Sequence, residues 1–248
     1  KRQVDGHNMR QMMKLFNEAK RVEGPVVVHV LTKKGRGYEP ASAHPDRFHG
    51  TGPFDIKTGR VLQKKTVPGY TDVFSKALVS LGEKNKKLTA ITAAMPDGTG
   101  LKRFRNVYPD RFFDVGIAEE TAVALASGIA ANGGKPVYGV YSTFVQRTFD
   151  QIAQDLCINN SPATIVTFWG SVYGMNDVTH LGFQDIPMMA NIPNLVYLAP
   201  TTKEEYLAML DWSVEQDKYP VVISMPGNGV HPAKYPVASS YDPLNEYQ

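Results

Sequence analysis

The pattern of apolar and polar positions along the chain changes near residue 70. Before it, residues 8–21 place apolar side chains at helical spacing, which predicts a helix. The run PVVVHVL at 25–31 predicts a strand buried on both faces. Residues 32–60 are rich in Gly, Pro and charge and show no periodicity. Such a stretch indicates a linker or a functional loop.

From about residue 70 the pattern alternates regularly between helical and strand-like segments. Helices are predicted over 71–83, 118–132, 144–158 and 202–215, and strands over 88–93, 135–141, 163–169, 195–200 and 220–225. Segments of these lengths in alternation imply an α/β fold, with a largely parallel sheet and helices on both faces. Ligands of such sheets bind beyond the carboxyl ends of the strands. The informative loops therefore follow residues 93, 141, 169 and 200.

The composition and charge of the chain limit the classes of binding partner that we expect. Hydrophobic residues make up 42% and charged residues 21% of the chain, as in ordinary globular proteins. The net charge of +3 comes from scattered Lys and Arg with no basic stripe, which argues against nucleic acid. No apolar run has the length of a membrane span and no signal peptide opens the chain, so we expect a cytoplasmic protein without a membrane partner. The single cysteine, Cys157, excludes an intrachain disulfide, and its helical context predicts a buried structural thiol.

Three loops carry candidate chemistry. In DVGIAEETAVALASGIA (114–130), Glu119 and Glu120 begin a small, apolar helix, where acidic residues also serve the helix dipole. In YSTFVQRTFDQ (141–151), Tyr141, Phe144 and Arg147 follow a strand and suit a flat ring that bears an anionic group. The glycine-rich loop at 170–186 contains His180, for which a structural and a functional role both remain open. The loop AAMPDGTGLKRF, after residue 92, is better interpreted as a turn than as a phosphate loop.

Together the motifs DVGIAEE, YSTFVQRTFDQ and THLGFQD resemble the pyrimidine-binding domain of thiamine-diphosphate enzymes of the transketolase family. Within that family they are most similar to the 1-deoxy-D-xylulose-5-phosphate synthases. Upstream, VDGHN, TKKGRGYEPA and FHGTGPFD resemble the end of the diphosphate-binding domain and the interdomain linker. The resemblance divides the chain into a diphosphate-domain remnant (1–40), a linker (41–69), the pyrimidine-binding domain (70–235) and the start of a linker to a third domain (236–248).

The resemblance implies a transferase that decarboxylates pyruvate and passes a two-carbon unit to an aldehyde such as glyceraldehyde 3-phosphate, for isoprenoid and thiamine precursor synthesis. Thiamine diphosphate and Mg²⁺ are the implied cofactors, and a homodimer is the implied assembly. The segment that binds Mg²⁺ is expected upstream of residue 1, so no residue here is assigned to the metal and we expect the isolated chain to be an inactive fragment. Glu119 would hydrogen-bond N1′ of the aminopyrimidine, in apolar surroundings that let a carboxyl carry a proton near neutrality.

The other roles also come from the resemblance. It implies catalytic roles for Glu119, His49 and His180. Cofactor contacts would come from Glu119, Phe144, Tyr141, Ile117 and Lys34. Substrate contacts would come from Arg147, Tyr141, His180 and Asn176. Glu120 is expected to face solvent or an interface, because it lies about 100° further around the helix.

The chain departs from the synthase pattern in its substrate loops. Trp169 stands where an arginine is expected, Asn176 where an aspartate is expected, and a second arginine is missing near Gly227. Because a bidentate arginine–phosphate contact is not replaced by Trp or Gly, we expect a different acceptor or a different route of binding. Two alternatives remain open: a transketolase-like enzyme or split subunit with another acceptor, and a non-catalytic paralogue.

Overall fold

The computed structural model of the 248-residue chain describes residues 3–62, 68–170, 178–225, 227 and 229–243. The chain divides into two compact units, residues 1–66 (unit 1) and 67–248 (unit 2). Each is described by itself. Among the described residues, no helix combines the length and the apolar character needed to cross a bilayer.

Unit 1 is a small assembly around one helix. Its elements are β1 (Val4–Asp5), α1 (Met9–Ala19), β2 (Val30–Leu31) and α2 (Glu39–Ala43). β1 and β2 pair in parallel, and Asn8 caps α1 by accepting a hydrogen bond from the Gln11 amide. The helix predicted over residues 8–21 is therefore confirmed.

Two expectations for unit 1 are wrong. The strand expected over residues 25–31 contains only two residues, and Val27 is 95% exposed rather than buried. Within the described part of the unit, β2 pairs only with the short β1, and Val26 and Val27 before it are exposed. The segment expected to lack regular structure contains α2 and a cluster of aromatic rings. Phe48 and Tyr38 lie 5.6 Å apart between ring centroids, and Phe48 and Phe54 lie 5.2 Å apart.

Unit 2 contains a six-stranded parallel sheet with the strand order β4-β3-β5-β6-β8-β7. Its strands are β3 (Leu88–Thr92), β4 (Phe112–Asp114), β5 (Lys135–Tyr141), β6 (Thr164–Phe168), β7 (Val196–Leu198) and β8 (Val221–Ser224). Its α-helices are α3 (Tyr70–Lys84), α4 (Lys102–Val107), α5 (Glu119–Ala131), α6 (Phe149–Gln151), α7 (Asp185–Met189) and α8 (Lys203–Glu215). Short 3₁₀ turns are η1 (Pro109–Arg111), η2 (Val145–Thr148) and η4 (Val178–His180), and η3 (Ile152–Ile158) is a π-helix.

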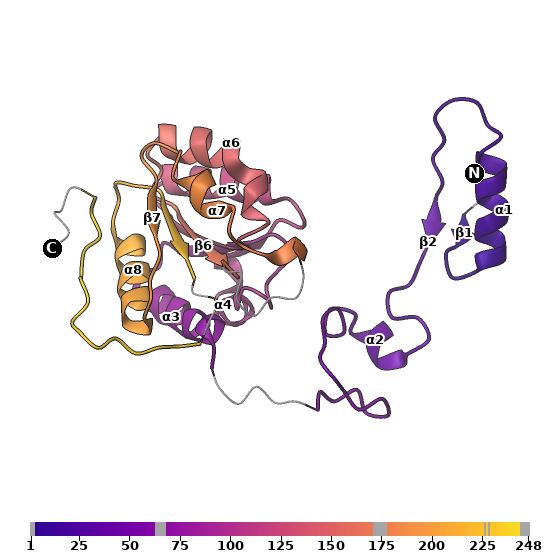
Figure 1. The fold of residues 1–248 in the computed structure, drawn as a ribbon, viewed down its shortest axis with the longest axis horizontal. Helices are drawn as coiled ribbons and strands as arrows, with labels where there is room; N and C mark the ends of the chain where they lie inside the picture. The colour runs from indigo at the N-terminus through magenta and orange to yellow at the C-terminus, as the bar shows by residue number, and fades with distance from the viewer. Residues whose placement is uncertain (1–2, 63–67, 171–177, 226, 228, 244–248) are drawn as a thin grey trace. The chain divides into compact units, whose positions relative to one another are not determined.

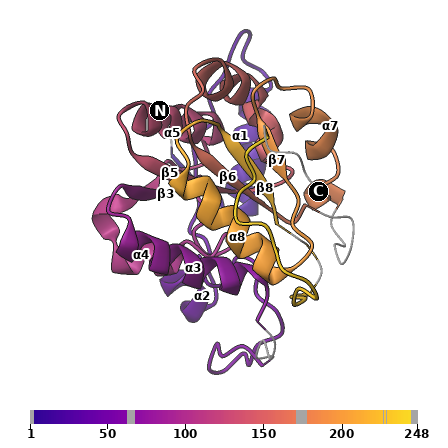
Figure 2. The same cartoon turned by 90° about the vertical axis from the view of Figure 1, so that its left-hand side faces the viewer.

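Helices cover both faces of this sheet, which confirms the predicted architecture (Figures 1 and 2). One core, on the side of α3, α4 and α8, contains Phe74, Leu78, Phe104 and Tyr206. The other core, on the side of α5, η3 and α7, contains Ala122, Val123, Tyr138 and Ile152. Alternate residues of β5 enter opposite cores, as the two-residue period of a strand requires.

The predicted elements of unit 2 agree with the structure in position, with two differences. The short edge strand β4 and the helices α4 and α7 are not anticipated, because three to six residues carry too little periodicity. The helix expected over 144–158 is a sequence of a 3₁₀ turn, α6 and the π-helix η3. The N-terminus of α8 is capped, since Thr202 accepts from the Glu205 amide and the Glu205 carboxylate accepts from the Thr201 amide.

Candidate active site

The topology of unit 2 creates a crevice at one edge of the sheet. The chain leaves β3 for β4 on one side and then crosses to β5 on the other side. Loops that leave neighbouring strands in opposite directions open a space beyond the carboxyl ends of those strands. The residues after β4 and β5 therefore face one another here, and they include Glu119, Tyr141 and Phe144.

Glu119 is the first residue of α5, and it is only 2% exposed although it is acidic. The small residues that follow explain this burial: Ala122 and Ala126 let α5 lie closely against the sheet. Glu120, the next residue, is exposed. The two acids at the start of this helix thus have different environments, because Glu119 is enclosed by the protein and Glu120 faces solvent.

Arg147 is the charged partner of Glu119. Its Nη1 donates to Glu119 Oε2 at 3.1 Å, and the Arg147 side chain is 55% exposed. The arginine belongs to η2, which follows β5, and so it reaches the carboxylate from a different element. The sequence placed both residues near the site but gave no sign of their contact, because they are 28 positions apart.

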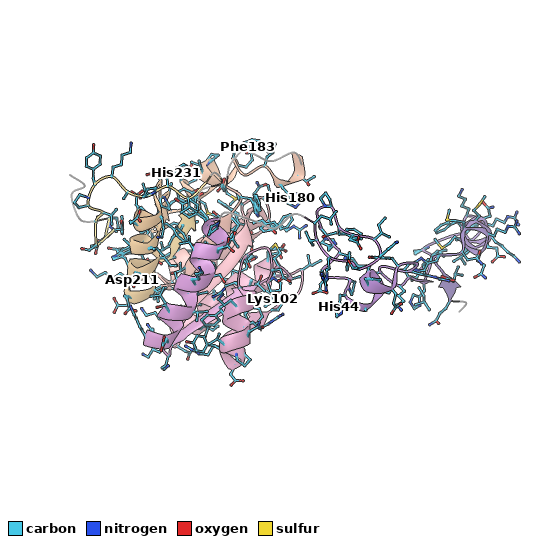
Figure 3. All side chains as sticks on the ribbon, turned by 90° about the horizontal axis from the view of Figure 1, so that it is seen from below. His44, Lys102, His180, Phe183, Asp211 and His231 are labelled. Atoms are coloured by element: carbon cyan, nitrogen blue, oxygen red, sulfur yellow. The ribbon has the colours of Figure 1, made fainter. Side chains whose placement is uncertain are left out.

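Aromatic rings form a continuous surface beside this ion pair. The rings of Tyr141 and Phe144 stack with centroids 5.5 Å apart and an angle of 29°. His180 approaches both edge-on, at 6.0 Å from Tyr141 and 5.3 Å from Phe144. His180 Nδ1 lies 2.8 Å from Thr179 Oγ1, which fixes one side of the imidazole. Figure 3 labels His180 at the edge of unit 2, well apart from Asp211 on α8 in this view.

Trp169 extends the same surface. It directly follows β6, and its indole stands at 82° to the Tyr141 ring with centroids 6.5 Å apart. Its φ of +62° lies in the left-handed region, which is uncommon for a large side chain. Such backbone conformations persist where surrounding structure holds them and are frequent at functional sites.

The loops under the rings are fixed by two residues that sequence reasoning missed. Asp114, at the end of β4, accepts from the amides of Ala94 and Gly116 through Oδ1, at 2.8 and 3.1 Å. It thereby ties together the loops that follow β3 and β4. Gly98 lies against the Tyr141 hydroxyl so closely that a Cβ would overlap it. This close approach explains the glycine-rich turn after β3.

Two tyrosine hydroxyls near the crevice have pKa values that are raised by burial. Burial raises the pKa of Tyr141. Tyr138 lies beneath α5, where burial raises its pKa strongly and the charges of Glu119 and Glu120 raise it further. Both phenols therefore remain protonated at neutral pH.

The remaining predicted residues divide between the two units. In unit 1, Lys34 Nζ and His49 Nδ1 lie 2.8 Å apart, and both side chains are exposed. In unit 2, Ile117 is 78% exposed just before α5. Asn176 lies outside the described residues. The structure thus brings together Glu119, Arg147, Tyr141, Phe144 and His180 in one unit, and Lys34 and His49 in the other.

A second hollow in unit 2 is unrelated to this chemistry. A groove of about 570 Å³ runs between α3 and α8 and is lined by residues such as Val73, Lys76 and Leu207. None of the predicted site residues within the described ranges lines it. Within the described ranges, no cluster of three or more His, Cys, Asp or Glu side chains is arranged to hold a metal ion.

The donors at the crevice suit an aminopyrimidine. A buried carboxyl can hydrogen-bond a ring nitrogen, and the stacked aromatic rings offer a flat apolar surface to a heterocycle. The residues present therefore fit the pyrimidine half of thiamine diphosphate.

Known proteins agree with this interpretation. The 1-deoxy-D-xylulose-5-phosphate synthase of Natranaerobius thermophilus is 47% identical over 231 residues, which are 92% of this chain and 36% of that protein. The synthase of Pelotomaculum thermopropionicum is 48% identical over 84% of this chain and 32% of that protein. This chain thus spans about a third of the length of these relatives.

Solved structures support the same fold. One described as "Split gene transketolase, inactive beta4 tetramer" has a TM-score of 0.58 and 25% identity, over 69% of this chain and 55% of that chain. Residues 67–230 match the family described as "Transketolase, pyrimidine binding domain". The chain belongs to that family of pyrimidine-binding domains.

Proposed function

We propose that the complete protein in which these residues occur is a thiamine-diphosphate-dependent transferase. It takes a two-carbon unit from pyruvate and joins it to an aldehyde, and so contributes to isoprenoid and thiamine precursor synthesis. The relatives named as 1-deoxy-D-xylulose-5-phosphate synthases support this proposal. The observation that carries it is Glu119, a carboxyl that is 2% exposed and pairs with Arg147. The amide of Arg147 in turn donates to the carbonyl of Phe144, whose ring stacks on Tyr141.

Each site residue then has a defined task. When bound, thiamine diphosphate supplies a nucleophilic carbon that can attack a ketone. Glu119 holds a proton at the pyrimidine ring nitrogen, and Phe144 and Tyr141 position the ring by contact with its plane. His180 lies at the edge of both rings, where it can exchange a proton with a substrate oxygen. Arg147 provides positive charge for a carboxylate such as that of pyruvate.

The rest of the assembly belongs to the same proposal. Lys34 and His49, which are hydrogen-bonded in unit 1, would act from the diphosphate side. Residues 1–40 would be part of a diphosphate-binding domain, 41–69 its linker, and 236–248 the start of a further linker. Mg²⁺ would be held by oxygen ligands outside this chain. We also propose a cytoplasmic homodimer, and the exposed Ile117 and the small outer residues of α5 suit an interface.

A second candidate is a subunit of a divided enzyme with another acceptor. The likeness to the protein described as "Split gene transketolase, inactive beta4 tetramer" favours it, because that description names a transketolase encoded by a split gene. Reconstitution separates the candidates: a divided enzyme gains activity only when a second polypeptide is added.

The test compares Glu119→Gln with Glu120→Gln in the complete protein. Loss of the Glu119 proton should lower the rate of pyruvate decarboxylation about 10²- to 10⁴-fold. The Glu120 variant should remain within twofold of the parent, because that side chain is exposed. Calorimetric titration with thiamine diphosphate and Mg²⁺ should show weaker binding for the Glu119 variant alone. Equal rates and equal affinities in both variants would overturn the proposal and favour a non-catalytic paralogue.

A further inference from the structure

We propose that Trp169 determines the acceptor specificity of this site. Together with Tyr141 and Phe144 it forms a surface, here called the aromatic wall, that favours an uncharged aldehyde over a phosphorylated one. This inference rests on the proposed function and specifies the class of its second substrate.

The aromatic wall is continuous and fixed in position. Tyr141 is in contact with both neighbours, stacked on Phe144 at 5.5 Å and edge-on to Trp169 at 6.5 Å. Gly182 packs so closely that a Cβ there would lie 2.6 Å from the Trp169 carbonyl oxygen. The backbone of Trp169 is therefore held from the α7 side as well as by β6, and its left-handed φ sets the direction of the indole.

The indole also presents free surface. Trp169 is 42% exposed, whereas the preceding residue, Phe168, is 1% exposed. The two residues face opposite environments at the end of one strand. A bulky apolar ring that is held rigidly yet left half open at the crevice is suited to contact a small ligand.

The distribution of charged residues also favours an uncharged aldehyde. From Thr148 to Thr202 the sequence contains no Lys or Arg, and this stretch includes every residue between β6 and β7. It does contain four acids, of which Asp185 is buried. The described cation next to the aromatic wall is Arg147, which pairs with Glu119 and is assigned in the proposed function to the carboxylate of pyruvate rather than to the acceptor. Arg and Lys are the strongest side-chain donors to a phosphate dianion, and this stretch contains neither.

The reaction balances without a phosphate. The bond between the carboxylate carbon and the keto carbon of pyruvate breaks and releases carbon dioxide. The two-carbon acetyl unit that remains forms a bond to the aldehyde carbon, and the aldehyde oxygen takes up one proton. The product is an unphosphorylated hydroxyketone, and no outside oxidant or reductant is needed.

The test compares two acceptors in the complete holoenzyme with pyruvate as the donor: glyceraldehyde and glyceraldehyde 3-phosphate. We expect the ratio of their kcat/KM values to favour glyceraldehyde at least tenfold. Trp169→Arg should shift this ratio at least tenfold towards the phosphate, and Trp169→Phe should leave it within threefold. Tyr235→Arg adds the same charge at an exposed position and should not change the ratio.

A binding measurement gives an independent result. The difference in fluorescence between the parent holoenzyme and its Trp169→Phe variant reports on the Trp169 indole. Its fluorescence should change saturably with glyceraldehyde and remain constant with inorganic phosphate at the same concentration. A wild-type preference for glyceraldehyde 3-phosphate, or an unchanged ratio in Trp169→Arg, would overturn this inference. Decarboxylation of pyruvate without any aldehyde reports on the proposed function separately, so the two can fail independently.

Discussion

At the scale of single residues, the pairing of Glu119 with Arg147 is the feature with the clearest energetic consequence. The carboxylate is nearly inaccessible to water, and the guanidinium is half exposed. Removing only the arginine leaves a buried charge without its partner, which costs more than the pair itself contributes. The asymmetry between the two partners predicts how single and double variants should differ.

We predict that Arg147→Met lowers the free energy of unfolding by about 1–2 kcal/mol, a value reduced because the arginine is partly solvated. In a Glu119→Gln background, the same change should cost less than half as much, since no charge remains to be stabilised. Denaturant unfolding of the four proteins at neutral pH measures the coupling. Strict additivity would show that the ion pair contributes nothing to stability.

Cys157 gives a prediction about alkaline pH. The thiol is buried as the sequence predicted, and burial raises its pKa to about 12. In the unfolded chain it ionises near its ordinary value of 9.0. Between these values the unfolded state has lost the proton and the folded state has kept it, so stability falls as pH rises. The loss from pH 8 to pH 10 is about 1.4 kcal/mol for one such group.

Between pH 8 and pH 10, the free energy of unfolding of the variant Cys157→Ala should fall by about 1.4 kcal/mol less than that of the parent. Comparing each protein with itself at the two pH values removes the constant cost of the deleted sulfur atom. Urea denaturation at pH 8 and pH 10 provides the measurement. Parallel loss of stability in both proteins would show that the thiol is not protected in the folded state.

Residue-level reasoning from the sequence located the site better than its contacts. A carboxyl that heads an apolar helix and an aromatic pair at the end of a strand are local patterns, so the sequence alone indicates Glu119, Tyr141 and Phe144 as candidates. The tie from Asp114 to the Ala94 amide joins positions 20 residues apart, and the contact of Gly98 with Tyr141 spans an even longer separation. Contacts of this kind depend on strand order, which no single stretch of sequence contains.

At the scale of elements, the π-helix η3 is the main departure from the predicted pattern. The carbonyl of Asp155 accepts hydrogen bonds from the Ser127 hydroxyl of α5 at 2.7 Å and from the Asn159 side chain at 3.1 Å. Side chains that compete for a helix carbonyl disturb the regular ladder of backbone bonds. Apolar periodicity predicted a helix here correctly, but it cannot indicate this competition because Ser127 belongs to another element.

We predict that Ser127→Ala lowers the free energy of unfolding by about 1–2 kcal/mol, because the hydroxyl is buried and bonded to both Asp155 and Ser161. Hydrogen exchange of amides in η3 should become faster as its tie to α5 is lost. Thr121→Ala, at an exposed position of the same helix, is the control and should change stability by less than about 0.5 kcal/mol. An equal effect of both substitutions would contradict this account of η3.

At the scale of the whole molecule, the two units differ in how much apolar surface they bury. Both hydrophobic cores are composed of residues 70–241. In the described part of unit 1, the buried hydrophobic side chains are Val4 and Ala41, while Met9, Met13 and Phe16 of α1 are exposed. A polypeptide gains stability mainly by burying apolar surface, so the units should behave differently when separated.

We predict that residues 67–248 fold cooperatively without unit 1, because their cores include no residue of unit 1. Their free energy of unfolding should lie within about 0.5 kcal/mol of that of the whole chain. Residues 1–66 should show little stable structure alone, since a two-residue strand pair and one amphipathic helix cannot offset the entropy of ordering. Circular dichroism and denaturant unfolding of the two pieces test both statements. A cooperative transition in residues 1–66 alone would mean that unit 1 is a domain in its own right. It would then contradict our proposal that residues 1–40 are part of a larger diphosphate-binding domain.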